Sequence, residues 1–333
     1  MAIGSGMGSS FGFSAETTYG TRVAPAKFVK HRSAAINRVP NRVQGEGIIT
    51  GSFGPNLDHY VETYHAATGT VAIDVPYSKM GVLLNTLMGG SVSPVQQAAS
   101  AAYLQTHPLA DVYGKSITGQ VGVPYRDGTV KCHEFTGGKI TSAEFSCSTD
   151  GLLEANLQID GRKFDDTQTL ATVSHNAGVK AFHGGQMAFK IGTYNSEAAI
   201  AVRDVSCTIE RPLDTEDYTT NSSNLKSQPV LNGPAQISGS VTVDWTLADG
   251  KALQDLVVAN TSNSVVMEWV GTTAIASTYY PTFRITLPSV TWDGDIQGAD
   301  GPNELSSKFD FTWRDDSSGN LPTITYMSTD TAL

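Results

Sequence analysis

The chain has 333 residues, of which 40% are hydrophobic and 16% are charged, against roughly 25% charged residues in typical soluble domains. With 22 basic and 32 acidic residues its net charge is −10, and the sequence contains no run of Lys or Arg that could neutralise phosphates. This length and composition are enough for two β-rich domains with buried cores. It excludes a protein that holds nucleic acid tightly through the phosphates.

Neither a targeting signal nor a membrane span is predicted. The first residues lack a basic segment followed by an apolar one, and no stretch approaches 18 apolar residues. The three cysteines, Cys132, Cys147 and Cys207, form no Cys-x-x-Cys motif and have no His at ligand spacing. They predict free thiols in a protein made in a reducing cytosol.

Residues 4–12, GSGMGSSFG, raise the question of a phosphate-binding loop. Such a loop needs a buried strand before it and a helix after it, but only three residues precede this one, and Gly20 and Pro25 break any helical pattern that follows. We therefore predict an N-terminal arm over residues 1–26, of which 1–15 become ordered only on a neighbouring subunit.

Two segments read as a strand followed by a helix. Residues 69–90 and 239–260 align without gaps at an offset of 170, which matches Gly69 with Gly239, Val71 with Val241, Asp74 with Asp244 and Leu83 with Leu253. Apolar residues at helical spacing predict helices at 77–89 and 246–259, each packed on its own sheet. The alignment predicts two similar halves.

A long polar stretch with Gly and Pro precedes each of these segments, at 40–68 and 211–238. Loops of this length are uncommon in compact domains. Two interpretations stay open: the loops are mobile, or they become ordered by reaching across to another subunit.

An antiparallel meander is predicted from about 115 to 161. Asp-Gly pairs at 127–128 and 150–151 predict turns, and residues 139–147 and 152–160 alternate between apolar and polar side chains. The polar face carries Glu144, Glu154 and Asp160. These carboxylates belong either to an ordinary solvated surface or to the lining of a channel.

No pattern in the sequence supports a catalytic or a metal site. The seven His are scattered, and His133 lies between Cys132 and Glu134 on a strand, where neighbouring side chains point to opposite faces. Asp293, Asp295 and Asp300 resemble part of a calcium loop but lack the closing Glu of an EF-hand, so a turn is the better interpretation. We predict no enzyme, no cofactor and no metal.

Three segments resemble the tail tube, or major tail, proteins of long-tailed bacteriophages: residues 16–48, 74–90 and 122–162. The resemblance implies a β-sandwich-like domain with one flanking helix, which assembles into rings that stack into a tube for viral DNA. Some members are similar to two such domains fused in one chain, so that three chains make a pseudo-sixfold ring; six chains per ring is the alternative.

The resulting expectation is a mainly β protein with two similar antiparallel β-sandwich or barrel-like tube domains, each with one flanking α-helix, plus terminal arms and long loops. The divisions are an N-terminal arm (1–26), a first tube domain (27–165), a linker (166–185), a second tube domain (186–316) and a C-terminal arm (317–333). The two arms suit exchange of strands between subunits.

The expected function is that of a structural virion protein whose stacked rings form a conduit for DNA ejection. Its expected partners are copies of itself, other tail proteins and DNA that passes without specific binding; it does not bind membranes. It would be made and assembled in the host bacterial cytoplasm, with Glu144, Glu154 and Asp160 as candidate lumen-facing residues. The alternative is an adhesin-type β-sandwich that binds a carbohydrate or protein ligand.

Overall fold

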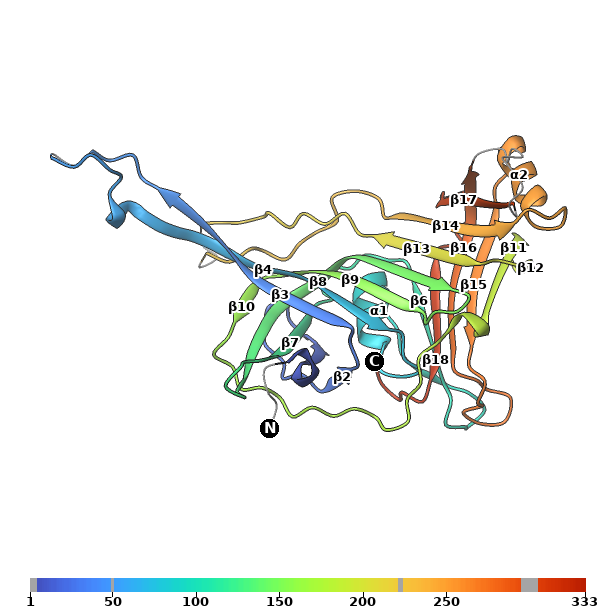
Figure 1. Ribbon diagram of the computed structural model, residues 1–333, viewed down its shortest axis with the longest axis horizontal. Coiled ribbons are helices and arrows are strands. Elements are labelled where there is room, and N and C mark those ends of the chain that lie inside the picture. Colours follow the sequence, from blue (N-terminus) through green and yellow to red (C-terminus); the bar gives the residue numbers. More distant parts are fainter. Residues whose placement is uncertain (1–4, 49–50, 221–223, 295–304) are drawn as a thin grey trace.

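The computed structural model describes residues 5–48, 51–220, 224–294 and 305–333. These residues form eighteen strands and two α-helices, so the mainly β prediction is confirmed. Figure 1 shows a body built from two layers of strands, with a long two-stranded hairpin projecting at the left.

One antiparallel sheet runs through both halves of the chain, and we call it the shared sheet. Its strands, in spatial order, are β3 (Ser33–Gln44), β4 (Tyr60–Asp74), β9 (Glu154–Gly161), β8 (Val130–Ser148), β13 (Asp204–Glu210), β14 (Gln236–Asp244) and β17 (Ser306–Trp313).

The second layer packs against the apolar face of the shared sheet. In the first half it consists of the early part of β8 with β2 (Lys27–Val29), β1 (Ser10–Ala15), β7 (Ile117–Pro124) and β10 (Lys163–Asp165). Against the second half it consists of β12 (Ser196–Ile200), β11 (Met187–Thr193), β15 (Asn263–Val270), β16 (Thr282–Asp293), β18 (Thr323–Ser328), β6 (Tyr103–Pro108) and β5 (Val95–Gln96). Of these, β6 and β5 come from the first half of the chain and join this layer through β18.

Alternation along the strands produces the core between these layers. Each strand of the shared sheet from β4 to β17 turns apolar side chains inward, including Val71, Leu157, Phe145, Cys207, Val241 and Phe309, all at most 2% exposed. Helix α1 (Gly81–Met88) is buried along its whole length, whereas α2 (Gly250–Ala259) buries only Gly250 and Leu253. Both helices lie within the ranges that the spacing predicts.

The strands around the two aligned segments pair in the same way in both halves. The Arg32 amide donates to Ala72 O at 2.8 Å, and the Arg203 amide donates to Thr242 O at the same distance. The two acceptors, Ala72 and Thr242, are equivalent at the offset of 170. Strand β4 pairs with β9 as β14 pairs with β17, with Asp74 opposite Glu154 and Asp244 opposite Ser306. The repeat therefore extends well beyond the residues that align in sequence.

The matched glycines have a packing reason. A Cβ on Gly69 would collide with the carbonyl oxygen of Ala35, and one on Gly239 would collide with the carbonyl oxygen of Ser206. Both carbonyls lie on the neighbouring strand that comes earlier in the chain, which is β3 for Gly69 and β13 for Gly239. Close approach of two backbones requires glycine at both positions.

Two expectations about the ends of the chain are wrong. Strand β1 is hydrogen-bonded between β2 and β7, and Phe11 and Phe13 are 0% exposed, so residues 10–15 become ordered on their own chain. Near the C-terminus, β18 lies between β16 and β6. Because both of its edges are occupied within the chain, β18 has no edge left for exchange with another subunit.

The two predicted loops differ from each other. Much of 40–68 belongs to the β3–β4 hairpin, so the prediction of a loop there is wrong outside its tip. Residues 211–220 and 224–235 are mostly irregular, with isolated bridges from Leu213 to Leu231 and from Tyr218 to Lys226. This segment reaches across the first half of its own chain.

Candidate functional face of the shared sheet

The face of the shared sheet opposite the core carries polar side chains from both halves. Residues directly opposite one another in neighbouring strands point to the same side, so rows can be followed across the sheet. One row contains Asp74, Glu154, Ser146, Ser206, Ser240 and Asp310. The next contains Ala72, Asn156, Glu144, Thr208, Ser238 and Thr312.

Small hydroxyl and acidic side chains dominate this polar face. Glu210, Asp204 and Asp244 add further carboxylates on β13 and β14, while Lys308 is a cation on β17. Two arginines next to the sheet are engaged by its acids: Arg32 with Asp74 and Glu154, and Arg203 with Asp244. The face therefore presents an acidic, hydroxyl-rich surface with few cations available to a polyanion.

The three carboxylates singled out in the sequence have different environments. Glu144 is exposed on β8, between Asn156 and Thr208. Glu154 is half-buried and forms an ion pair with Arg32. Asp160 is only 8% exposed and accepts a hydrogen bond from Lys226 Nζ, so the expectation that it lies on an open face is wrong for the chain as it folds.

Residues of 211–220 and 224–235 cover Asp160, and we call these residues the clasp. Burial raises the pKa of the Asp160 carboxyl, and the Lys226 ammonium opposes that rise. Arg162 Nε donates to Lys226 O at 3.1 Å, and the rings of Tyr64 and Tyr218 stack with centroids 3.9 Å apart. The two halves are thus joined by an ionic and aromatic contact as well as by the sheet.

No pattern in the sequence predicts the clasp contact. Lys226 lies 66 residues from Asp160, in a polar segment without periodicity. A groove beside the contact is lined by Asn37, Thr70, Gln158, Pro212 and Thr215, which come from the sheet and the clasp.

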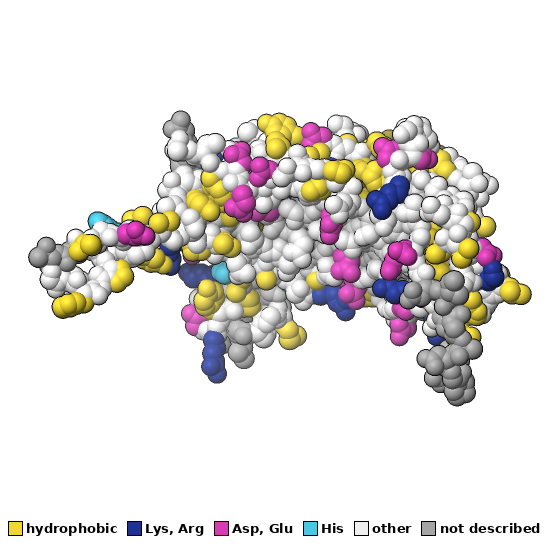
Figure 2. Space-filling model, turned by 90° about the horizontal axis from the view of Figure 1, so that it is seen from above, with side chains coloured by type: hydrophobic (Ala, Val, Ile, Leu, Met, Phe, Trp, Pro, Cys, Tyr) yellow, Lys and Arg dark blue, Asp and Glu magenta, His cyan; other side chains and the backbone are white. Residues whose placement is uncertain are grey.

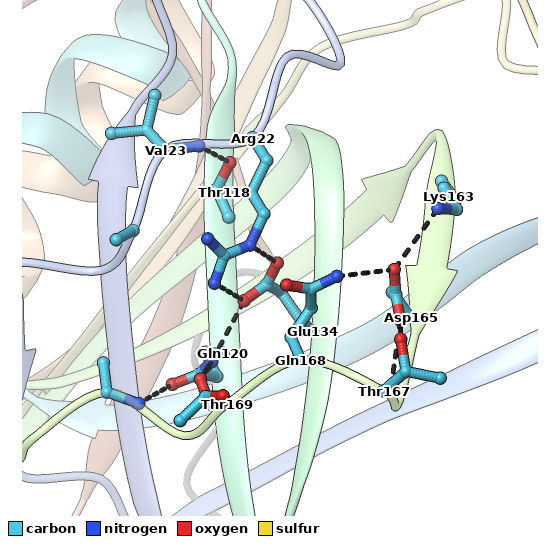
Figure 3. Close-up of polar contacts among 12 residues, drawn as sticks. Arg22, Val23, Thr118, Gln120, Glu134, Lys163, Asp165, Thr167, Gln168 and Thr169 are labelled. Carbon is cyan, nitrogen blue, oxygen red and sulfur yellow. Dashed lines mark hydrogen bonds and ion pairs between the residues drawn. The ribbon is translucent and has the colours of Figure 1, made fainter.

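A second buried polar cluster holds the segment between the halves (Figure 3). Glu134 is 0% exposed and accepts hydrogen bonds from Arg22 Nε at 2.5 Å, Arg22 Nη2 at 3.0 Å and Gln120 Nε2 at 3.0 Å. Gln120 also binds the backbone of Thr169 and Ala171, at 3.1 and 2.7 Å. These bonds fasten the start of residues 166–185 to the first half.

The hydrogen bonds of this cluster account for the buried carboxylate of Glu134 without a catalytic role. Its carboxylate is satisfied by Arg22 and Gln120, whereas the ring of His133 packs edge-on against Phe164 at 5.3 Å. The neighbours therefore point apart, as strand geometry predicts. Burial raises the pKa of Cys132 to about 11 and that of Cys207 to about 12, so neither is a ready nucleophile.

Two kinds of feature are absent from the described residues. No group of three or more His, Cys, Asp or Glu side chains among them is placed to hold a metal ion. Neither helix in this part of the chain is long and apolar enough to cross a membrane. Asp295 and Asp300 of the calcium-loop comparison lie outside the described residues.

Comparison with known proteins agrees with this architecture. A family model described as phage tail tube protein matches residues 6–314. No curated protein matches the chain. Because the family match covers nearly the whole chain, the chain belongs to the phage tail tube protein family. It is a structural protein of the virion tail, in a family whose members assemble into a tube with other tail proteins.

Proposed function

We propose that the polar face of the shared sheet lines the bore of the tail tube through which viral DNA leaves the virion. The observation that carries this proposal is the continuity of the face, which crosses from the first half to the second at the β8–β13 pair. A ring of such sheets would present one uninterrupted surface of hydroxyls and carboxylates.

The chemistry of the face suits passage without binding. Carboxylates repel phosphates within a Debye length, roughly 8 to 10 Å, and few cations are free to release counterions and retain the DNA. The opposite face of the sheet cannot serve, because it is filled by the core. In this role the chain has no catalytic step and needs no cofactor.

The proposed ring contains three chains. Two halves with the same strand pairing supply six similar units per three chains, and head-to-tail contacts that complete a rotation produce a closed ring. The rings would stack into the tube, and assembly would take place in the host cytoplasm before the virion is complete.

Charge reversal on the polar face tests the proposed lining. Glu144→Lys combined with Glu210→Lys changes two exposed side chains of the face and leaves the Glu154–Arg32 ion pair intact. Virions with this variant should assemble tails but eject DNA several-fold more slowly at low salt, with recovery as salt screens the added charge.

The matched control is Asp166→Lys, which makes the same kind of change at an exposed residue beyond β10 in the other layer. It should leave ejection unaltered. An unchanged ejection rate in the Glu144 and Glu210 variant at every salt concentration would show that this face does not line the bore.

A further inference from the structure

A buried cation lies at the start of the clasp without a counterion. Arg211, the residue that follows β13, is 3% exposed. Its Nη2 atom donates to the carbonyl oxygen of Ala110, whereas Nε and Nη1 have no hydrogen-bond partner. Among the described residues no carboxylate forms an ion pair with this guanidinium, and Asp111 acts on it only through space. Arg211 therefore lacks the partner that buried charges normally have.

A buried guanidinium without a counterion is costly for the fold. Burial lowers the pKa of the Arg211 guanidinium, and the Asp111 carboxylate opposes that change. Asp111 is itself exposed, and its Oδ1 atom accepts from the Tyr113 amide at 2.9 Å. Arginine stays charged in proteins, so it does not escape the cost by losing its proton. A water molecule would accept from the free N–H groups but would leave the charge uncompensated.

The groove beside the clasp contact includes Arg211 in its lining. Its volume of about 580 Å³ lies within the range of ligand pockets. Hydroxyl and amide side chains supply much of the polar lining: Asn37, Thr68, Thr70, Thr141, Gln158 and Thr215. Such groups donate hydrogen bonds to an anion without adding charge of their own.

A carboxylate in the same lining is already paired. Asp160 lines the groove, and its Oδ1 atom accepts from Lys226 Nζ. The Lys226 ammonium offsets the negative charge that would otherwise repel an anion from the groove. The unpaired charge of this lining is thus the positive charge of Arg211.

We propose that the groove holds a small oxyanion of the phosphate class, bound by the free N–H groups of Arg211. Hydrogen bonds between a guanidinium and phosphate oxygens are charge-assisted, and arginine is well suited to phosphate recognition. The bound anion would supply the missing counterion. This inference does not depend on the proposed lining of the bore.

The burial of Arg211 restricts the ligand to small anions. A guanidinium that is 3% exposed is out of reach for the backbone of a DNA duplex. On the face that Figure 2 shows, Lys and Arg side chains are scattered among acidic ones rather than gathered into a patch. A polyanion therefore finds no basic surface on this face, whereas a free phosphate ion is small enough to enter the groove.

A bound anion would strengthen the start of the clasp. The Arg211 amide donates to Thr141 O at 2.7 Å, and Thr215 lines the groove from the clasp side. An anion held there would make its hydrogen bonds only in the folded chain. Phosphate should therefore stabilise the chain in proportion to its occupancy of the groove.

Calorimetric titration of the full-length chain with inorganic phosphate tests the site. The wild type should bind one phosphate per chain with a saturable heat, and Arg211→Met should weaken binding by about tenfold or more. Methionine needs no counterion, so this variant should fold. Arg211→Lys keeps the charge but loses donors, and its affinity should fall between the other two. This second variant keeps the test decisive if the methionine variant fails to fold.

Arg126→Met is the matched control, because Arg126 is exposed in the turn between β7 and β8. It should bind phosphate as the wild type does. Phosphate also stabilises proteins by exclusion from their surface, so thermal unfolding is compared in phosphate and in chloride at equal ionic strength. A larger gain in the wild type and Arg126→Met than in Arg211→Met supports the site. An equal gain in all three, or a titration without saturable heat, would overturn it.

Discussion

At the scale of single residues, the environment of Asp160 is set by a contact with a distant part of the chain. Its place on the polar side of β9 follows from alternation, but its burial depends on Lys226, whose side chain is 1% exposed. A buried ion pair contributes little compared with apolar side chains of similar size, yet removal of one partner is costly because it leaves the other charge unpaired.

Lys226→Met should therefore lower the free energy of unfolding by about 3 kcal/mol. The double change Lys226→Met with Asp160→Leu should recover most of that loss, since it removes both charges. Urea unfolding followed by circular dichroism measures both variants. Equal destabilisation by the single and double changes would contradict the argument, and Glu144→Gln on the exposed face serves as a control expected within about 0.5 kcal/mol of the wild type.

At the scale of elements, Gly12, which belongs to a pattern typical of loops, is a packing requirement. Alternating glycine and serine around β1 predict an arm, but a Cβ on Gly12 would meet the ring of Phe28 at 2.5 Å. A small residue in a strand often marks such close approach. The β3–β4 hairpin was missed for a different reason: its projecting part has no buried face, so its apolar residues show no alternation.

The repeat makes a prediction about two equivalent strand positions. Gly69→Ala and Gly239→Ala should each destabilise the chain by more than the roughly 0.5–1 kcal/mol that glycine costs in a strand, because the added methyl meets a backbone oxygen in both halves. Thermal unfolding measures the loss. Gly54→Ala, at a site with open space, is the control and should be nearly neutral. A large loss at only one of the two glycines would contradict the equivalence of the halves.

At the scale of the whole molecule, the pairing of the two halves predicts the stoichiometry of the ring. Native mass spectrometry of isolated rings should find three chains, because each chain carries two units that pair alike. Six full-length chains in one ring would contradict this count. Equal spacing of the six units in a reconstruction would support it independently of mass.

The sequence by itself determined the features that depend on neighbours along the chain. Alternation placed the β8–β9 hairpin and its polar face, helical spacing placed α1 and α2, and the alignment at an offset of 170 pointed to two similar halves. The pattern after residues 4–12 also argued against a phosphate loop there, because Gly20 and Pro25 break the helix that such a loop requires.

Only the tertiary structure decided which distant segments meet. It buried β1 and β18 inside the chain, placed the clasp over Asp160, and joined the halves through β8 and β13. These contacts join residues far apart in sequence, whose side chains carry no local period. Their free energy comes from burial and pairing that exist only once both layers are assembled, which is why strand alternation alone could not separate the open carboxylate of Glu144 from the covered one of Asp160.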